Sequence, residues 1–174
     1  MKNNKLLFLD LDNCLIYSSY QEIDSLTLID KKKWHYLYHR PFLKEFLKFV
    51  SKSFDLIFYT SSKLDYAKWV VKSFNLNTNY KIYSRQNTKK RVTNYGEYYN
   101  KSLSYIDISQ HNYKKISVLD DRTDLWLDEH LDYWDIRPWM GEADDNELEL
   151  LIIKRLKKQA RSKEFRNSNN LNEN

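Results

Sequence analysis

Three short apolar runs, each followed at once by acidic or hydroxyl side chains, constrain the fold of this chain more than any other feature. The runs are Lys5–Leu9, Asp55–Tyr59 and Lys115–Leu119. Continuous apolar stretches of this length are typical of strands buried on both faces of a parallel sheet. The polar residues that follow are Asp10 and Asp12, then Thr60, Ser61 and Ser62, then Asp120 and Asp121. Because the carboxyl ends of parallel strands meet at one edge of a sheet, we expect these groups to lie together.

Segments with helical periodicity separate the apolar runs. Apolar residues recur at helical spacing from Pro41 to Val50, from Leu64 to Phe74 and, after an approximate capping box at Asp144, to Leu156. Further strands are predicted at 34–39, 80–84 and 133–136, a loop or small hairpin at 85–100, a short helix at 101–108 and a helical turn at 124–129. Alternating strands and helices predict one α/β domain whose mostly parallel sheet is covered on both faces.

The composition excludes several classes of functional site. With only two glycines, Gly96 and Gly141, the chain has no glycine-rich phosphate loop and no nucleophile elbow. A single cysteine, Cys14, excludes an internal disulfide and a cysteine zinc site. No apolar run approaches the roughly 20 residues that cross a bilayer, and no signal peptide is recognisable. We therefore expect a cytoplasmic protein (nuclear if the source is a eukaryote) that is not secreted and has no membrane partner.

The net charge of +5 resides at the C-terminal end of the chain. Residues 151–174 hold seven basic and two acidic side chains, and the preceding residues are neutral overall. We divide the chain into a single domain, residues 1–160, and a basic tail, residues 161–174, that we expect to be disordered. Such a tail can bind nucleic acid, but a solvated helix end whose cations suit the helix dipole is the simpler interpretation.

The acidic residues at the predicted sheet edge indicate a metal site. Asp10, Asp12, Asp120 and Asp121 would place four acidic groups close together, which is unfavourable without a cation. An oxygen-rich site of this kind suits Mg²⁺. Acids after any single strand more often cap a helix or solvate a turn. Three polar strand ends at one edge nevertheless favour a site.

Four motifs, taken in order along the chain, carry a resemblance to a known family. Residues 8–15, FLDLDNCL, resemble the first motif, Asp-x-Asp-x-Thr/Val, of the haloacid dehalogenase superfamily, and residues 59–62, YTSS, resemble its second. Residues 39–47, HRPFLKEFL, and 120–126, DDRTDLW, are similar to stretches of the phosphatases that act on the RNA polymerase II C-terminal domain (the FCP/SCP, NIF-like family). The resemblance implies a haloacid-dehalogenase-like, Rossmannoid three-layer fold with a small β insertion and no large cap.

The resemblance also implies a role for each residue of the site. Asp10 would be the nucleophile that forms an aspartyl-phosphate, and Asp12 would be first the general acid and then the general base. Thr60 would bind a phosphoryl oxygen, and Lys101, at the third-motif position, would offset negative charge. Mg²⁺ would be held by Asp10, the carbonyl of Asp12, Asp120 and Asp121, with Asp121 the favoured direct ligand.

Substrate contacts are expected beside these groups. By the same resemblance, Ser61 and Arg85 would bind the substrate. The segment from residue 85 to residue 101 is basic and aromatic and corresponds to the small β insertion of the family. It either contacts a phosphopeptide or is an ordinary exposed hairpin, and the sequence does not distinguish these two interpretations.

One residue departs from the family pattern. Cys14 stands where the family has Thr or Val. Its volume is close to theirs, so the packing should survive, but a thiol makes a weaker hydrogen bond than a hydroxyl. Burial and acidic neighbours would raise the pKa of this thiol, so we interpret Cys14 as structural rather than nucleophilic.

Together these features predict an enzyme, a Mg²⁺-dependent phosphatase that hydrolyses phosphomonoesters through an aspartyl-phosphate. We expect phosphoserine or phosphothreonine in a protein or peptide as the substrate, because no large cap is evident to enclose a small molecule. Two alternatives stay open. One is a phosphatase of nucleic-acid ends or small metabolites. The other is a catalytically silent binding module, like the family's relative in the mitochondrial inner-membrane translocase, although retention of the full residue set argues against it.

Overall fold

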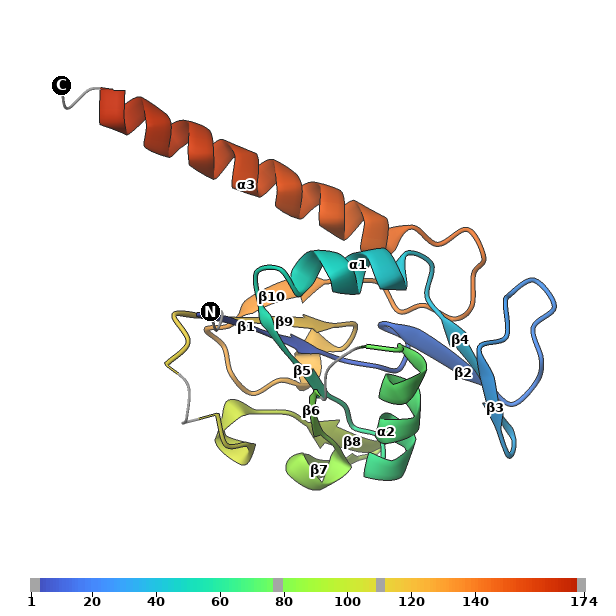
Figure 1. The fold of residues 1–174 in the computed structure, drawn as a ribbon. Helices are drawn as coiled ribbons and strands as arrows, with labels where there is room; N and C mark the ends of the chain where they lie inside the picture. The colour runs from blue at the N-terminus through green and yellow to red at the C-terminus, as the bar shows by residue number, and fades with distance from the viewer. Residues whose placement is uncertain (1–3, 77–79, 109–111, 172–174) are drawn as a thin grey trace.

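A five-stranded parallel sheet forms the centre of the computed structural model (Figure 1). The structure describes residues 4–76, 80–108 and 112–171, with side chains up to residue 161. The sheet has the order β10-β9-β1-β5-β6. Its strands are β1 (Lys5–Leu9), β5 (Asp55–Tyr59), β6 (Lys81–Tyr83), β9 (Lys115–Asp120) and β10 (Asp132–Asp135). The predicted α/β class with a central parallel sheet is confirmed.

Three helices pack on one face of this sheet. They are α1 (Leu43–Val50), α2 (Leu64–Ser73) and α3 (Glu147–Leu171). Successive side chains of a strand point to opposite faces. Leu7 and Leu9 of β1 accordingly pack with apolar residues of all three helices, whereas Leu6 and Phe8 belong to a second apolar cluster on the other face. The amphipathic helices therefore bury their apolar sides on the sheet.

Irregular chain with 3₁₀ turns covers the other face of the sheet. The helix predicted at 101–108 is wrong, because this segment forms only the 3₁₀ turn Leu103–Tyr105. A second turn, Thr123–Leu125, stands in place of the helical turn predicted at 124–129. The physical reason lies at Lys101, whose backbone N–H donates to Leu125 and whose carbonyl accepts from Leu127, both at 3.0 Å. These pairings place Lys101 in an isolated β-bridge with Trp126, so a helical turn begins only after it, at Leu103.

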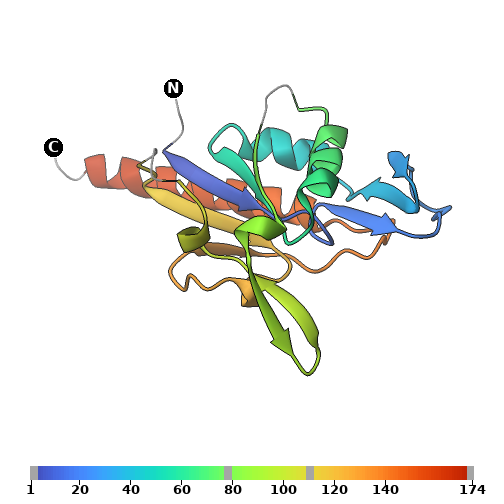
Figure 2. The ribbon, with the colours of Figure 1, turned by 90° about the horizontal axis from the view of Figure 1, so that it is seen from below.

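Two small antiparallel sheets lie outside the central one. The first contains β2 (Ile16–Ser19), β4 (His35–His39) and β3 (Asp30–Lys32), in that order. The strand predicted at 34–39 is β4, and β2 and β3 carry too few apolar residues for the sequence to predict them. The second is the hairpin of β7 (Lys89–Thr93) and β8 (Gly96–Asn100), which projects away from the central sheet (Figure 2). This hairpin is the small β insertion.

Helix α3 is longer than the sequence predicts. The apolar pattern supports a helix as far as Leu156, but α3 continues to Leu171 and its C-terminal half extends beyond the rest of the molecule (Figure 1). The helix therefore includes most of residues 161–174, and the division of the chain into a domain and a disordered tail stays a prediction. Among the described residues, no helix is both long enough and apolar enough to span a membrane.

A buried ion pair joins Arg40, directly after β4, to Asp145, just before α3. The side chain of Arg40 is fully buried, and its guanidinium donates hydrogen bonds of 2.8 and 2.7 Å to the two carboxylate oxygens of Asp145. It donates two more, to the backbone carbonyl oxygens of Cys14 at 3.0 Å and Arg137 at 2.9 Å. A single guanidinium, bidentate on a carboxylate, therefore holds segments that are far apart in the sequence.

Replacing Arg40 by Leu should strongly destabilise the protein. The substitution leaves the Asp145 carboxylate without its partner and should lower the free energy of unfolding by about 3 kcal/mol or more. Urea denaturation followed by circular dichroism measures this loss. Arg137→Gln is the matched control, because the Arg137 side chain is exposed and pairs with Glu147 at the surface. Equal effects of the two substitutions would contradict a special role for the buried pair.

Candidate active site

The carboxyl ends of β1, β5 and β9 meet at one edge of the sheet, as their parallel order requires. A pocket of about 300 Å³ lies at this edge. It is lined by Asp10, Asp12, Asn13, Thr60, Ser61, Glu97, Tyr98, Tyr99, Lys101, Asp120, Asp121, Arg122 and Leu125. The structure thus brings together the polar strand ends that the sequence singles out, and it adds residues of the β7–β8 hairpin to them.

Three carboxylates form a cluster in this pocket. Carboxylate oxygens of Asp10, Asp120 and Asp121 lie within 4.8 Å of one another. Asp10 and Asp120 are buried, and Asp121 is partly buried. The carboxylate of Asp12 is not part of this cluster, so the expected contribution of Asp12 to a metal site falls to its backbone carbonyl.

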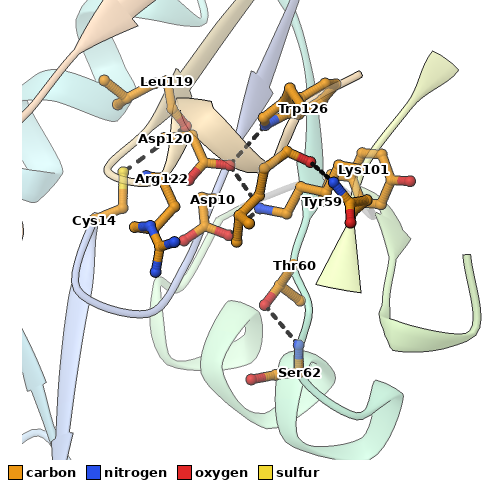
Figure 3. A network of polar contacts seen from close by, with 12 residues as sticks. Asp10, Cys14, Tyr59, Thr60, Ser62, Lys101, Leu119, Asp120, Arg122 and Trp126 are labelled. Atoms are coloured by element: carbon orange, nitrogen blue, oxygen red, sulfur yellow. Dashed lines mark hydrogen bonds and ion pairs between the residues drawn. The ribbon is translucent and has the colours of Figure 1, made fainter. Parts of the chain in front are cut away.

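The ammonium group of Lys101 lies between two of these carboxylates (Figure 3). Its Nζ donates to Oδ1 of Asp10 at 2.5 Å and to Oδ2 of Asp120 at 2.7 Å, and all three side chains are buried. Trp126 Nε1 donates to the same oxygen of Asp120 at 2.8 Å. The other oxygen of Asp120 accepts from the backbone N–H of Arg122 at 2.8 Å. Both oxygens of Asp120 are therefore fixed by the protein itself.

The pocket carries more negative charge than Lys101 neutralises. Burial raises the pKa of Asp10 well above its ordinary value, and the Lys101 ammonium offsets this only in part. Burial and the charge of Asp120 raise the pKa of Asp121 to about 6. Burial lowers the pKa of Lys101, but the two carboxylates outweigh burial, so the pKa is raised overall and the group stays protonated. Three carboxylates against one ammonium fit a divalent cation that prefers oxygen ligands, such as Mg²⁺.

Two hydroxyl groups hold the carboxylate of Asp12. Ser62 Oγ donates to Oδ2 at 2.7 Å, and the hydroxyl of Tyr66, in the first turn of α2, donates to Oδ1 at 2.6 Å. Burial and the adjacent charge of Asp12 raise the pKa of Tyr66, so the phenol stays protonated and can act as a hydrogen-bond donor. The sequence analysis missed Tyr66. The sequence signal that could have found Tyr66 is its position in the helix that starts directly after the second motif.

Thr60 and Ser61 line the pocket, but Arg85 is not among the described residues that line it. Thr60 is buried, and its Oγ1 accepts a hydrogen bond from the backbone N–H of Ser62 at 3.1 Å. Arg85 Nε donates to the carbonyl of Ser61 at 2.7 Å, and its guanidinium lies over the ring of Tyr99, 4.5 Å from the centroid. Arg85 therefore supports the wall of the pocket. Its contact with substrate stays a prediction.

Arg122 is a further pocket residue that the sequence analysis missed. It forms a bidentate pair with Asp124, with both hydrogen bonds at 2.8 Å, and lies over the ring of Tyr98 at 5.7 Å from the centroid. The sequence does carry a signal for Arg122, because this residue directly follows Asp120 and Asp121 in the motif at residues 120–126. Arg122 places a positive charge beside the acidic cluster, where it suits an anionic substrate.

Cys14 is fully buried beside the site. Its Sγ lies 3.8 Å from the carbonyl oxygen of Leu119. Burial and the charge of Asp10 raise the pKa of the thiol well above its ordinary value. An inaccessible, protonated thiol is a poor nucleophile, in agreement with the structural role expected for this residue.

The family model described as NLI interacting factor-like phosphatase matches residues 5–166, which is nearly the whole chain. The chain belongs to this family. Membership confirms the resemblance to the FCP/SCP, NIF-like phosphatases that the four motifs indicate.

Curated relatives of this NIF-like chain include a viral and a yeast protein. The CTD phosphatase-like protein 355R of Invertebrate iridescent virus 3 is 36% identical over 91 residues, which are 42% of this chain and 47% of that protein. Phosphatase PSR1 of Saccharomyces cerevisiae is 27% identical over 153 residues, which are 84% of this chain and 34% of PSR1. The chain therefore spans less than half the length of these two relatives.

Solved structures of RNA polymerase II CTD phosphatases share the fold. Fcp1, titled an essential RNA polymerase II CTD phosphatase, has a TM-score of 0.55 and 22% identity, covering 90% of this chain and 50% of its own. A fission yeast Fcp1 variant bound to beryllium fluoride has a TM-score of 0.54 and 20% identity, covering 89% of this chain and 50% of its own. These likenesses support the haloacid-dehalogenase-like fold.

Magnesium should stabilise the protein more at neutral than at acidic pH. Because the pKa of Asp121 is raised to about 6 from 3.8, ionising this group costs stability as the pH rises through that range, and a bound cation offsets the cost. Below about pH 5, protons compete with the metal for the same carboxylate. We expect saturating Mg²⁺ to raise Tm by about 5 °C near neutral pH and by much less under acidic conditions.

Differential scanning calorimetry with Mg²⁺ or chelator measures this difference. Asp121→Asn should abolish the stabilisation, whereas Asp124→Asn should retain it, because Asp124 is exposed and lies outside the carboxylate cluster. A Tm that responds equally to Mg²⁺ in both variants would show that the cluster is not the metal site.

Proposed function

We propose that this NIF-like chain is a Mg²⁺-dependent phosphatase that hydrolyses phosphoserine or phosphothreonine in proteins through an aspartyl-phosphate. One observation carries the proposal. The Lys101 ammonium bridges the carboxylates of Asp10 and Asp120 in a pocket whose wall also contains Thr60. This arrangement combines an ionisable nucleophile with fixed positive charge and a hydroxyl for a phosphoryl oxygen.

In the first step, a carboxylate oxygen of Asp10 attacks phosphorus. A bond forms between this oxygen and phosphorus, the bond from phosphorus to the serine or threonine oxygen breaks, and Asp12 gives a proton to the leaving oxygen. Ser62 and Tyr66 both donate to Asp12, which stabilises the carboxylate that remains after the proton has left. Lys101 offsets charge on the nucleophile and the phosphoryl group.

In the second step, water attacks the phosphorus of the aspartyl-phosphate. Asp12, now a carboxylate, accepts a proton from this water, and the bond between Asp10 and phosphorus breaks to release inorganic phosphate. Asp10 returns to its carboxylate form and Asp12 to its protonated form. The same pair of acids therefore serves both half-reactions.

The metal site would be built from Asp10, the backbone carbonyl of Asp12, Asp120 and Asp121. When bound there, Mg²⁺ supplies positive charge that stabilises the charge developing on the phosphoryl group. Lys101 and Trp126 both donate hydrogen bonds to Oδ2 of Asp120 and so fix the orientation of its carboxylate. The cluster therefore keeps its arrangement as a substrate enters or leaves.

The substrate proposal rests on the surroundings of the pocket. Tyr98 and Tyr99 of the projecting hairpin line the pocket, together with Arg122 and Ser61. These groups suit a phosphorylated peptide segment, with Ser61 and Arg85 among its proposed contacts. Fcp1 is a phosphatase of the RNA polymerase II CTD, a protein substrate, which agrees with this class. We place the reaction in the cytoplasm, or in the nucleus of a eukaryote, because a chain with a single cysteine has no internal disulfide of the kind typical of secreted proteins.

Phosphopeptide hydrolysis with Mg²⁺ tests the proposal. We expect release of inorganic phosphate from phosphoserine and phosphothreonine peptides, abolished by chelator. Asp10→Asn should lower kcat by about a thousandfold or more, because the amide is not a nucleophile. The control Asp65→Asn removes an exposed carboxylate in the first turn of α2 and should retain activity. Acid-quenched wild-type protein should carry covalent phosphate that is labile to hydroxylamine, and Asp10→Asn should not.

Two outcomes of this experiment would replace the proposal. Faster release of phosphate from 3′-phosphorylated oligonucleotides than from phosphopeptides would assign the chain to nucleic-acid ends. Folded protein that binds Mg²⁺ yet turns over none of these substrates would indicate a silent binding module on the same fold.

Tyr66→Phe should lower kcat by about tenfold with little change in KM, because Tyr66 contacts Asp12 rather than the substrate. The pH dependence of kcat should change as well, because the acid–base residue Asp12 loses one of its two hydroxyl donors. The control is Tyr113→Phe, which removes another hydroxyl that donates to a carboxylate, that of Asp55, away from the pocket. A pH profile unchanged from wild type would show that Tyr66 only packs.

A further inference from the structure

A second pocket lies at the opposite edge of the sheet from the acidic one. Its volume is about 420 Å³. Two of its residues, Lys5 and Lys115, are the first residues of the neighbouring parallel strands β1 and β9 and pair directly in register. The acidic pocket lies where these same strands end. The two pockets are therefore separated by the length of the strands, and binding in the second pocket would not require the proposed phosphatase reaction in the first.

The lining of this basic pocket combines positive charge with apolar surface. Its cations are Lys5, Lys115, Arg155 and Lys158, and its apolar residues are Phe49, Val50, Phe54 and Trp134. Among the described lining residues none is acidic. A volume of this size accommodates an organic molecule rather than a single inorganic ion.

Arg155 of helix α3 is the residue that most clearly lacks a full set of partners. Its guanidinium lies over the ring of Trp134, 3.6 Å from the centroid, and 85% of its side chain is buried, since 15% is exposed. Its Nε is buried, and no acceptor among the described residues lies within hydrogen-bonding distance. Its contact with Asp132, at 3.6 Å, is too long for a hydrogen bond. A buried guanidinium in this state is stabilised by an added anion.

Asp132 forms only a long ion pair with Arg155, because the oxygen nearest to Arg155, Oδ2, already accepts three hydrogen bonds. Oδ2 of Asp132 accepts from Lys115 Nζ at 2.9 Å, from Ser117 Oγ at 2.8 Å and from Trp134 Nε1 at 2.8 Å. These donors outweigh the effect of burial and lower the pKa of Asp132, so it stays ionised. Its one negative charge is shared between Lys115 and Arg155, so these two cations together keep a net positive charge.

We propose that this basic pocket binds a multiply charged organic phosphate with a flat apolar body, of which a nucleoside triphosphate is the simplest soluble example. The phosphate groups would contact Arg155 and the lysines, because a phosphate chain carries several charges and accepts charge-assisted hydrogen bonds from guanidinium and ammonium groups. The apolar body would lie against Phe49 and Phe54, at the end of α1 and before β5.

Calorimetric titration with ATP tests this proposal directly. The titration uses the unmodified 174-residue chain at constant ionic strength and in the presence of chelator, which removes the metal that the proposed phosphatase reaction needs. Saturable binding of ATP is expected, tighter than the binding of tripolyphosphate alone or of adenosine alone, because only ATP offers both the charge and the ring. Asp10→Asn should bind ATP as the wild type does, which separates this pocket from the acidic one.

Two substitutions in α3 and one matched control locate the site. Arg155→Gln should weaken ATP binding by about tenfold, the loss expected for a charge-assisted hydrogen bond in a buried setting. Lys158→Glu, at an exposed lining position, should weaken it by about threefold or more without risk to the core. The control is Lys157→Glu, which makes the same charge change on the same helix at an exposed residue outside the lining. It should leave the affinity near the wild-type value.

Each of several results would overturn the proposal. Absence of saturable ATP binding would show that Arg155 serves only to pack α3 on Trp134. Equal weakening by Lys157→Glu and Lys158→Glu would show that ATP responds to the general charge of α3 rather than to the pocket. Tripolyphosphate that binds as tightly as ATP would show that the apolar lining takes no part. Circular dichroism of each variant ensures that a loss of binding is not a loss of fold.

Discussion

The buried ammonium of Lys101, held between the carboxylates of Asp10 and Asp120, is the interaction on which the candidate active site depends. Two acids on neighbouring strands repel each other in a buried setting unless a cation separates them. Lys101 meets this need only because its backbone is paired with Leu125 and Leu127, which fixes it in extended form at the sheet edge. The irregular segment on that face, which breaks the regular alternation of strand and helix, is therefore what completes the site.

Most of the site could be predicted from sequence because parallel strands deliver their ends to one edge. Once Lys5–Leu9, Asp55–Tyr59 and Lys115–Leu119 are recognised as buried strands, the positions of Asp10, Thr60 and Asp120 follow from topology alone. The fold class follows from the same alternation, and the family comparison agrees with both. Residues that act through a neighbour were harder to find. Tyr66 reaches Asp12 from a helix, and only its position shortly after the second motif distinguishes it from the other tyrosines of the chain.

The features that sequence reasoning missed have a common physical origin in tertiary contacts. Strands β2 and β3 are short and polar, and they form because β4 offers them a backbone ladder rather than because of their own composition. The helix expected at 101–108 does not form at its first residue, because the backbone of Lys101 is hydrogen-bonded to Leu125 and Leu127, more than twenty residues away. Arg85 carries the charge expected of a substrate contact, but it donates to Ser61 and lies on Tyr99, two partners that no local pattern reveals.

The buried ion pair of Arg40 and Asp145 has a consequence for folding during synthesis. Its guanidinium joins the carbonyl of Cys14, in the loop that carries the first motif, to Asp145, more than one hundred residues later. Contacts of such large sequence separation form late, because a long loop must close before they stabilise anything. During synthesis, the first motif leaves the ribosome long before the residue that helps to fix its loop. A nascent chain that has not yet reached α3 would therefore leave the loop of the first motif without its contact to Asp145. A chaperone would be needed most during this stage of synthesis.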